Sequence, residues 1–218
     1  MKELDCWLSS PEMAFLAMNG GFEGTVRDRL MYQIQKLRHD EVVRSEKSVQ
    51  GKKPDIEILH KAKKDEKDEP LALAIIELKH NFLFHSDVFK GVEGDMKKWS
   101  GIKPPIPLFF IQIVIQIEKI TGDMVHFLKY KEAKPREPKK TEKRLKEIED
   151  YFCKLERKEK GILKTHMTRA VSKYPFELTT SLTFFILEIR SNKDHVQEMR
   201  EKCKQCDLMT VTSCLEKI

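Results

Sequence analysis

An acid and a base stand two residues apart in a segment that is otherwise typical of a buried β-strand. In PLALAIIELKH (residues 70–80), an apolar run ending in Ile76 continues into Glu77 and Lys79 without a turn signal. Alternate side chains of a strand point to the same face, so these two charges share one face. Burying an unpaired charge is costly, and the pattern therefore indicates that each charge has a partner or a ligand.

A second acid is predicted to lie beside the first. The segment PDIEILH (54–60) alternates in hydropathy and predicts another strand, and the charged segment KAKKDEKDE (61–69) predicts a hairpin connection. If the connection is centred near Glu66, antiparallel pairing of the two strands places Asp55 opposite Glu77.

A third acid lies upstream, on the core side of a predicted helix. Residues 22–37 carry apolar side chains at helical spacing, and Glu23 falls on the same stripe. The stripe consists of Val26, Leu30, Ile34 and Leu37. In the alternative interpretation, Glu23 pairs with Arg27 on the helix surface. Glu77 and Lys79 would then be only the solvated end of a strand.

These residue types together predict a metal site that acts on a phosphate. Two carboxylates a few ångströms apart repel each other, and one pKa rises unless a cation lies between them. Oxygen ligands with room for water suit Mg²⁺ or Mn²⁺. We expect Asp55 and Glu77 to hold the metal, and Lys79 to orient or deprotonate the water that attacks the phosphate.

The elements that must position these residues alternate between helices and strands. Helices are expected over residues 11–19, 22–37 and 85–100, and strands over 41–49, 54–60, 70–80 and 107–117. The last of these strands is apolar on both faces, as expected for a central strand covered by helices. The prediction is therefore an α/β fold with a central mixed β-sheet flanked by helices.

At these residues the sequence resembles the PD-(D/E)XK nuclease superfamily. The likeness is carried by PD at 54–55, by ELK at 77–79 and by the glutamate of the upstream helix. It covers about residues 11–117, where the order helix, strand, strand, strand, helix, strand is also that of the superfamily core. The resemblance implies a restriction-endonuclease-like fold and Mg²⁺-dependent hydrolysis of nucleic-acid phosphodiester bonds.

Carried over position by position, the resemblance also implies roles. Asp55 and Glu77 would be metal ligands, and Lys79 would be the catalytic lysine. Glu23 would match the helix glutamate that completes the metal site. The expected activity is that of a DNA endonuclease, either of the restriction type or similar to a Holliday-junction resolvase. A non-catalytic nucleic-acid-binding protein on the same fold is the alternative.

Basic residues indicate where DNA would lie. Lys52 and Lys53 immediately precede the PD dipeptide and would flank the metal site. The segment KYKEAKPREPKK (129–140) predicts a loop that either contacts DNA phosphates or is only a solvated connection. Its candidate contacts are Lys134, Arg136, Lys139 and Lys140. We expect a homodimer, because one site per chain cuts two strands most simply when two chains pair.

The second half of the chain is expected to form an extension of the core. We place the nuclease core in residues 1–128 and a C-terminal extension packed on it in residues 129–218, within one compact domain. A charged helix is predicted over 141–160 and a strand over 178–190.

Four cysteines form a possible second metal site. Cys6 precedes the first helix, and Cys203, Cys206 and Cys214 lie near the C-terminus, which resembles the cysteine set of one branch of the superfamily. Four thiolates would hold Zn²⁺ or an iron–sulfur cluster. The alternative is a set of reduced thiols without a ligand, because the C-x₂-C pair lies in or beside a predicted helix.

Composition limits the class of protein. The 218 residues suffice for one domain with a core, and a net charge of +6 permits a polyanionic partner without being a polybasic signature. We expect no secretory signal, because the N-terminus has no apolar segment, and the longest apolar run, 107–117, is too short to span a membrane. Five cysteines, an odd number, suit a reducing compartment. We therefore expect an intracellular, cytoplasmic protein.

Overall fold

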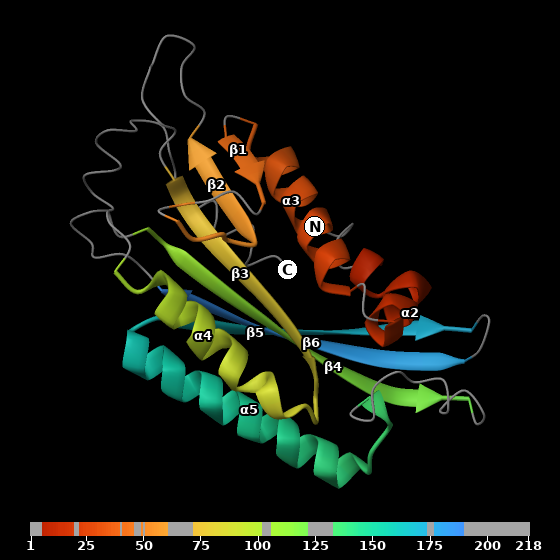
Figure 1. The fold of residues 1–218 in the computed structure, drawn as a ribbon. Coiled ribbons are helices and arrows are strands. Elements are labelled where there is room, and N and C mark those ends of the chain that lie inside the picture. The colour runs from red at the N-terminus through yellow and green to blue at the C-terminus, as the bar shows by residue number, and fades with distance from the viewer. Residues whose placement is uncertain are drawn as a thin grey trace.

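The computed structural model describes residues 6–19, 22–39, 41–45, 49, 51–60, 72–101, 106–121, 133–173 and 177–189. In this part of the chain a six-stranded mixed sheet has helices on both of its faces (Figure 1). The predicted α/β architecture with a central mixed sheet is confirmed at this level. None of the described helices is long and apolar enough to cross a membrane.

The bounds of the elements follow the chain. The helices are α2 (Pro11–Asn19), α3 (Phe22–Leu37), α4 (Lys90–Trp99) and α5 (Pro138–Glu159), with a 3₁₀ turn η1 (Ser86–Val88) before α4. The strands are β1 (Glu41–Arg44), β2 (Ile56–His60), β3 (Ala72–Phe82), β4 (Leu108–Ile120), β5 (Ile162–Ser172) and β6 (Leu178–Ile189). The predicted order helix, strand, strand, strand, helix, strand is confirmed for α3 through β4.

The strands follow the order β1-β2-β3-β4-β6-β5 across the sheet. Only β3 and β4 pair in parallel among the neighbouring described strands, and α4 forms the crossover between them. All other neighbours are antiparallel. The crossover sets α4 against the face of β3 opposite to α3, so side chains of one strand meet different helices on its two faces (Figure 1).

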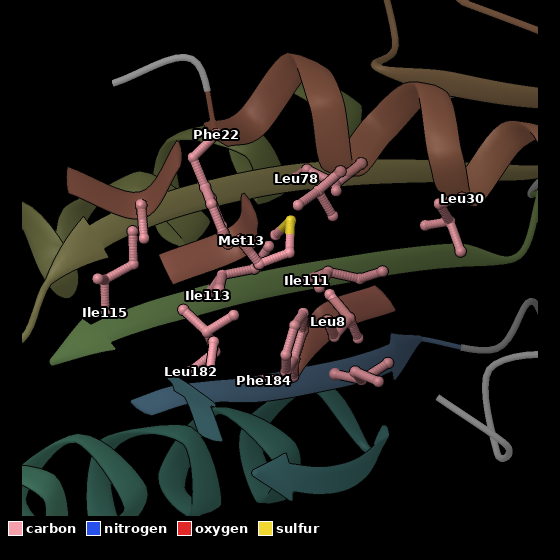
Figure 2. Packing of buried hydrophobic residues seen from close by; sticks show 14 of the residues in the cluster. Leu8, Met13, Phe22, Leu30, Leu78, Ile111, Ile113, Ile115, Leu182 and Phe184 are labelled. Carbon is pink, nitrogen blue, oxygen red and sulfur yellow. The ribbon is translucent and has the colours of Figure 1, made fainter. Parts of the chain in front are cut away.

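One face of the sheet is an apolar core beneath α2 and α3. Figure 2 shows Met13, Phe22 and Leu30 of the helical layer above strand residues that alternate along β3, β4 and β6. The strand residues drawn there include Leu78, Ile111, Ile113, Ile115, Leu182 and Phe184, all buried. Glu23 and the apolar stripe after it belong to α3, and the start of α3 therefore lies on this side.

The other face packs against α4 and α5. Its core contains Ile75 of β3, Phe110 of β4 and Phe185 of β6, and the Phe185 ring stacks on Phe152 of α5 with ring centroids 4.8 Å apart. Helix α5 begins with Pro138 at its first turn, where proline costs no hydrogen bond. The predicted loop over 129–140 is therefore wrong for its last residues, because Lys139 and Lys140 are helical.

Strand β5 (Ile162–Ser172) was not predicted from the sequence. It pairs only with β6 among the described strands and lies at the edge of the sheet, so much of its surface is exposed. Met167, for example, is 66% exposed. An edge strand needs few apolar side chains, and the polar residues of ILKTHMTRAVS hid its alternation. The predicted strand at 178–190 is confirmed as β6, in the interior of the sheet.

Candidate active site

The hairpin register brings Asp55 and Glu77 together as predicted. Ile56 is paired with Ile76, so the preceding Asp55 and the following Glu77 are neighbours on adjacent strands. The Asp55 Oδ2 atom accepts a hydrogen bond of 2.7 Å from the backbone N–H of Leu78. This bond fixes the Asp55 carboxylate against β3, although Asp55 itself lies just outside the regular strand.

Glu77 is a buried acid whose partners come from α4. Its side chain is 2% exposed. Its Oε1 atom accepts hydrogen bonds from the Trp99 indole N–H at 2.6 Å and from Lys98 Nζ at 2.7 Å. Burial is the main cause that raises the pKa of Glu77 to about 7, and the charges of Asp55 and Asp95 act in the same direction. The alternative in which Glu77 is a solvated strand end is wrong.

Lys79 lies on the same face and is half-buried beneath the start of α4. A side chain at Gly91 would meet Lys79, since a Cβ atom there would lie 3.3 Å from Lys79 Cγ. Lys79 Nζ is 3.5 Å from Asp95 Oδ2. Burial alone would lower the pKa of Lys79, but the surrounding carboxylates, with Asp95 foremost, raise it above its ordinary value. Lys79 therefore carries an ammonium at neutral pH.

Asp95 is a member of this cluster that was not predicted. It is buried, its Oδ2 atom forms the ion pair with Lys79, and burial raises its pKa. A signal for it exists in the sequence. Asp95 falls between Val92 and Trp99 at the spacing i, i+3, i+7, so it is an acid on the buried stripe of α4. The same signal had identified Glu23.

The partner of Glu23 is His80, which was not predicted. Its Oε2 atom lies 2.9 Å from His80 Nδ1, and the His80 ring packs near Phe22, with ring centroids 5.9 Å apart. His80 follows Lys79 directly and points to the other face of β3. Burial would raise the pKa of Glu23, but His80 and Lys79 together lower it. The structure thus gathers Asp55, Glu77 and Lys79, while Glu23 reaches this group only through its charge.

The basic residues before the PD dipeptide flank the cluster. The backbone carbonyl of Lys53 accepts a hydrogen bond of 2.5 Å from Lys98 Nζ. Lys52 Nζ lies 5.9 Å from the centroid of the Trp99 ring. Trp99 is 1% exposed and belongs to the core, and its indole N–H also donates a hydrogen bond to Glu77.

The other predicted DNA contacts lie elsewhere, around the start of α5. All four side chains are exposed: Lys134, Arg136, Lys139 and Lys140. The Arg136 guanidinium lies 5.5 Å from the centroid of the Phe84 ring, just after the end of β3. These residues are therefore not part of the cluster around Glu77, and their contact with DNA stays a prediction.

The cysteine site cannot be assembled from the described residues. Cys6 is an exposed free thiol. Cys203, Cys206 and Cys214 lie outside the described residues, so the predicted Zn²⁺ or iron–sulfur site stays a prediction.

Several oxygen atoms that could bind a divalent metal lie around Glu77. Within the described ranges, no group of three or more histidine, cysteine, aspartate or glutamate side chains is close enough to hold an ion by itself. Mg²⁺ commonly needs only one or two carboxylates, with water and substrate phosphate completing its shell. The carboxylates of Asp55 and Glu77 and the carbonyl of Lys53 are such donors, and the Asp95 carboxylate, which pairs with Lys79, lies nearby. These oxygens are ligands of the kind that Mg²⁺ or Mn²⁺ takes, and the metal itself stays a prediction.

Comparison of the whole chain with protein-family models, with curated proteins and with solved structures finds no match.

Proposed function

We propose that this protein is a Mg²⁺- or Mn²⁺-dependent endonuclease that hydrolyses DNA phosphodiester bonds, of the restriction type or similar to a Holliday-junction resolvase. One observation carries the proposal: Glu77, 2% exposed in mid-sheet, lies beside Asp55 and within a cluster of further charges. Burial of an unpaired charge is strongly unfavourable, so buried charges are usually paired. Clusters of such charges are common at functional sites.

Each residue of the cluster has a role in the proposed reaction. Asp55 and Glu77 hold the metal, which when bound supplies positive charge to the scissile phosphate and its attacking water. Lys79 is an ammonium, so it donates hydrogen bonds to the phosphate or to the water and stabilises negative charge in the transition state. Asp95 holds Lys79 in place from α4, at 3.5 Å. Asp95 is therefore a positioning residue.

The architecture supports the same proposal. The helix–strand order of α3 through β4 and the position of the ELK residues on β3 support a restriction-endonuclease-like core. The remaining strands, β6 and β5, continue the same sheet beyond that core. We propose a homodimer for double-strand cleavage, and light scattering with and without DNA measures its mass.

The test is metal-dependent cleavage of a supercoiled plasmid and of a four-way DNA junction. Wild-type protein is expected to cut at least one substrate with Mg²⁺ or Mn²⁺ and neither with EDTA. Glu77→Gln and Lys79→Met are expected to lower the rate by about 10²-fold or more, as for loss of one electrostatic catalytic group. Absence of metal-dependent cutting of both substrates, or cutting unaffected by both substitutions, contradicts the proposal.

The fold offers a matched control for Glu77. Glu57 on β2 is also 2% exposed, shares the same face of the sheet and is paired with a cation, Arg44, at 2.6 Å. Glu57→Gln breaks a comparable buried pair outside the proposed site. It is expected to lower stability while the folded protein keeps its cleavage rate.

A non-catalytic DNA-binding protein is the second candidate, and one observation favours it. Lys98 already neutralises Glu77, so the buried carboxylate has a cation without any metal. Salt-dependent binding of both DNA substrates without cleavage in Mg²⁺ or Mn²⁺ would identify this function.

A further inference from the structure

Lys98 occupies a position that a metal ion would also use. It lies in the last turn of α4, and its Nζ atom donates hydrogen bonds to Glu77 Oε1 at 2.7 Å and to the Lys53 carbonyl oxygen at 2.5 Å. A carboxylate oxygen and a main-chain carbonyl oxygen are the kinds of donor that Mg²⁺ and Mn²⁺ accept. The ammonium thus binds two of the oxygens proposed above for the metal.

The surroundings explain why a cation is needed there. Asp55 is adjacent to Glu77 through the hairpin register, and Asp95 lies one turn before Lys98 on α4. Without a nearby cation, Glu77 would be a buried carboxylate surrounded by like charges, which is strongly unfavourable. Lys98 therefore provides the folded protein with its own counter-charge.

The two lysines of the cluster differ in their freedom to move. The stem of Lys79 packs under α4, where even a methyl group at Gly91 would be crowded against it. Lys98 sits at the end of its helix, with Nζ 5.0 Å from the centroid of the Trp99 ring. A long side chain placed in this way can move its charged end into solvent without disturbing the core.

We infer that Lys98 is a resident cation of the site, which holds Glu77 in the metal-free protein and is displaced when a divalent ion binds. The inference rests on the proposed function in taking Glu77 as a metal ligand. It adds a specificity device: only an ion that replaces both the charge and the contacts of Lys98 enters the site. Binding of the divalent ion and binding of the Lys98 ammonium are then mutually exclusive.

The test measures Mn²⁺ binding to the DNA-free protein by isothermal titration calorimetry. Lys98→Met removes the charge and keeps most of the side-chain volume, and it is expected to bind Mn²⁺ about tenfold or more tightly than wild type, since a charged hydrogen bond no longer competes. Lys97→Met is the matched control, since Lys97 is the exposed neighbour on α4. It removes the same net charge and is expected to bind as wild type does.

Equal or weaker Mn²⁺ binding by Lys98→Met overturns the inference, and so does an equal gain in Lys97→Met, which would reduce the effect to net charge. Glu77→Gln is expected to abolish the binding in both backgrounds. Cleavage is measured separately on DNA. Metal-dependent cleavage without a change of affinity in Lys98→Met refutes only the resident cation, whereas tighter Mn²⁺ binding without any cleavage supports the resident cation and refutes the nuclease.

A second measurement uses the wild-type side chain, in case Lys98→Met does not fold. Lysines are labelled by reductive ¹³C-methylation, which keeps their charge, and Lys98 is assigned from the signal that is lost in Lys98→Arg. Addition of Mg²⁺ is expected to shift the Lys98 methyl resonance to that of a solvated lysine, with no shift for Lys97. An unmoved Lys98 resonance at Mg²⁺ concentrations that saturate binding overturns the inference.

Discussion

Along β3, neighbouring side chains enter surroundings of opposite character. Ile76 and Leu78 belong to the apolar core beneath α2 and α3, and Figure 2 shows Leu78 there. Glu77 and Lys79 point toward α4, where acidic and basic groups surround them. The face beneath α3 needs only apolar volume, whereas the face beneath α4 needs each charge to be matched. Substitutions on the two faces should therefore fail in different ways.

The largest effect on stability is expected from the apolar face. Leu78→Ala leaves a cavity in a fully buried position and is expected to lower the free energy of unfolding by about 2–5 kcal/mol. Mn²⁺ affinity and cleavage per folded molecule are expected to stay at wild-type values. Urea denaturation measures the free energy of unfolding, calorimetry the Mn²⁺ affinity, and the plasmid assay the cleavage rate. A folded Leu78→Ala protein that had lost Mn²⁺ binding would show that the faces are not independent.

The charged face is expected to make the free energy of unfolding depend on pH. The pKa of Glu77 is raised from 4.5 to about 7 by burial, so the folded protein keeps a proton that the unfolded chain releases. The free energy of unfolding should therefore fall as the pH rises from about 4.5 to 7, by up to about 3 kcal/mol from this group. In Glu77→Gln this decrease should be absent. Denaturation at pH 5 and pH 8 without divalent ions measures it, and Leu78→Ala, which keeps Glu77, should retain the wild-type slope.

A smaller effect is expected at the Trp99 donor. Trp99→Phe keeps an aromatic ring in the core but removes the N–H that binds Glu77, and it should lower the free energy of unfolding by about 1–3 kcal/mol. In a Glu77→Gln background the same change should cost less, because the charged acceptor is already lost. Equal costs in the two backgrounds would assign the whole effect to packing.

The smallest effect is expected at Glu23, whose partner His80 lies on the apolar side of β3. The pair is partly exposed, with 34% of the Glu23 side chain accessible, so Glu23→Gln should cost about 0.5–1 kcal/mol of unfolding free energy. Mn²⁺ affinity should change by less than about threefold for a residue outside the ligand set. A loss of tenfold or more would instead place Glu23 among the metal ligands, as the resemblance implies.

The hairpin part of the site was predictable because local rules determine it. The length of the connection and the alternation of the strands fixed the pairing of Asp55 with Glu77, and the structure has this register. The contribution of α4 was not predicted, although Asp95 lies on the buried stripe of that helix. Asp95, Lys98 and Trp99 become partners of β3 only through the crossover, which is a tertiary arrangement.

The order of the last strands was beyond local rules as well. No feature of residues 178–189 indicates that β6 pairs with β4 on one side and with β5 on the other. Strand order depends on the packing of α5, through contacts such as Phe152 with Phe185, against the sheet. The polar residues of β5 obscured its strand pattern, so the strand that pairs with the outer edge of β6 was not predicted from the sequence.

The position of β6 has a consequence for the nascent chain. Strand β4 is paired with β6 along most of its length, yet 57 residues separate the end of β4 at Ile120 from the start of β6 at Leu178. During synthesis, the backbone groups along this edge of β4 therefore stay unpaired until β6 has left the ribosome. A chain shortened to residues 1–128 would keep that edge open permanently. Such a fragment would self-associate through β4, and a ribosome that stalls between the two strands would release an aggregation-prone product.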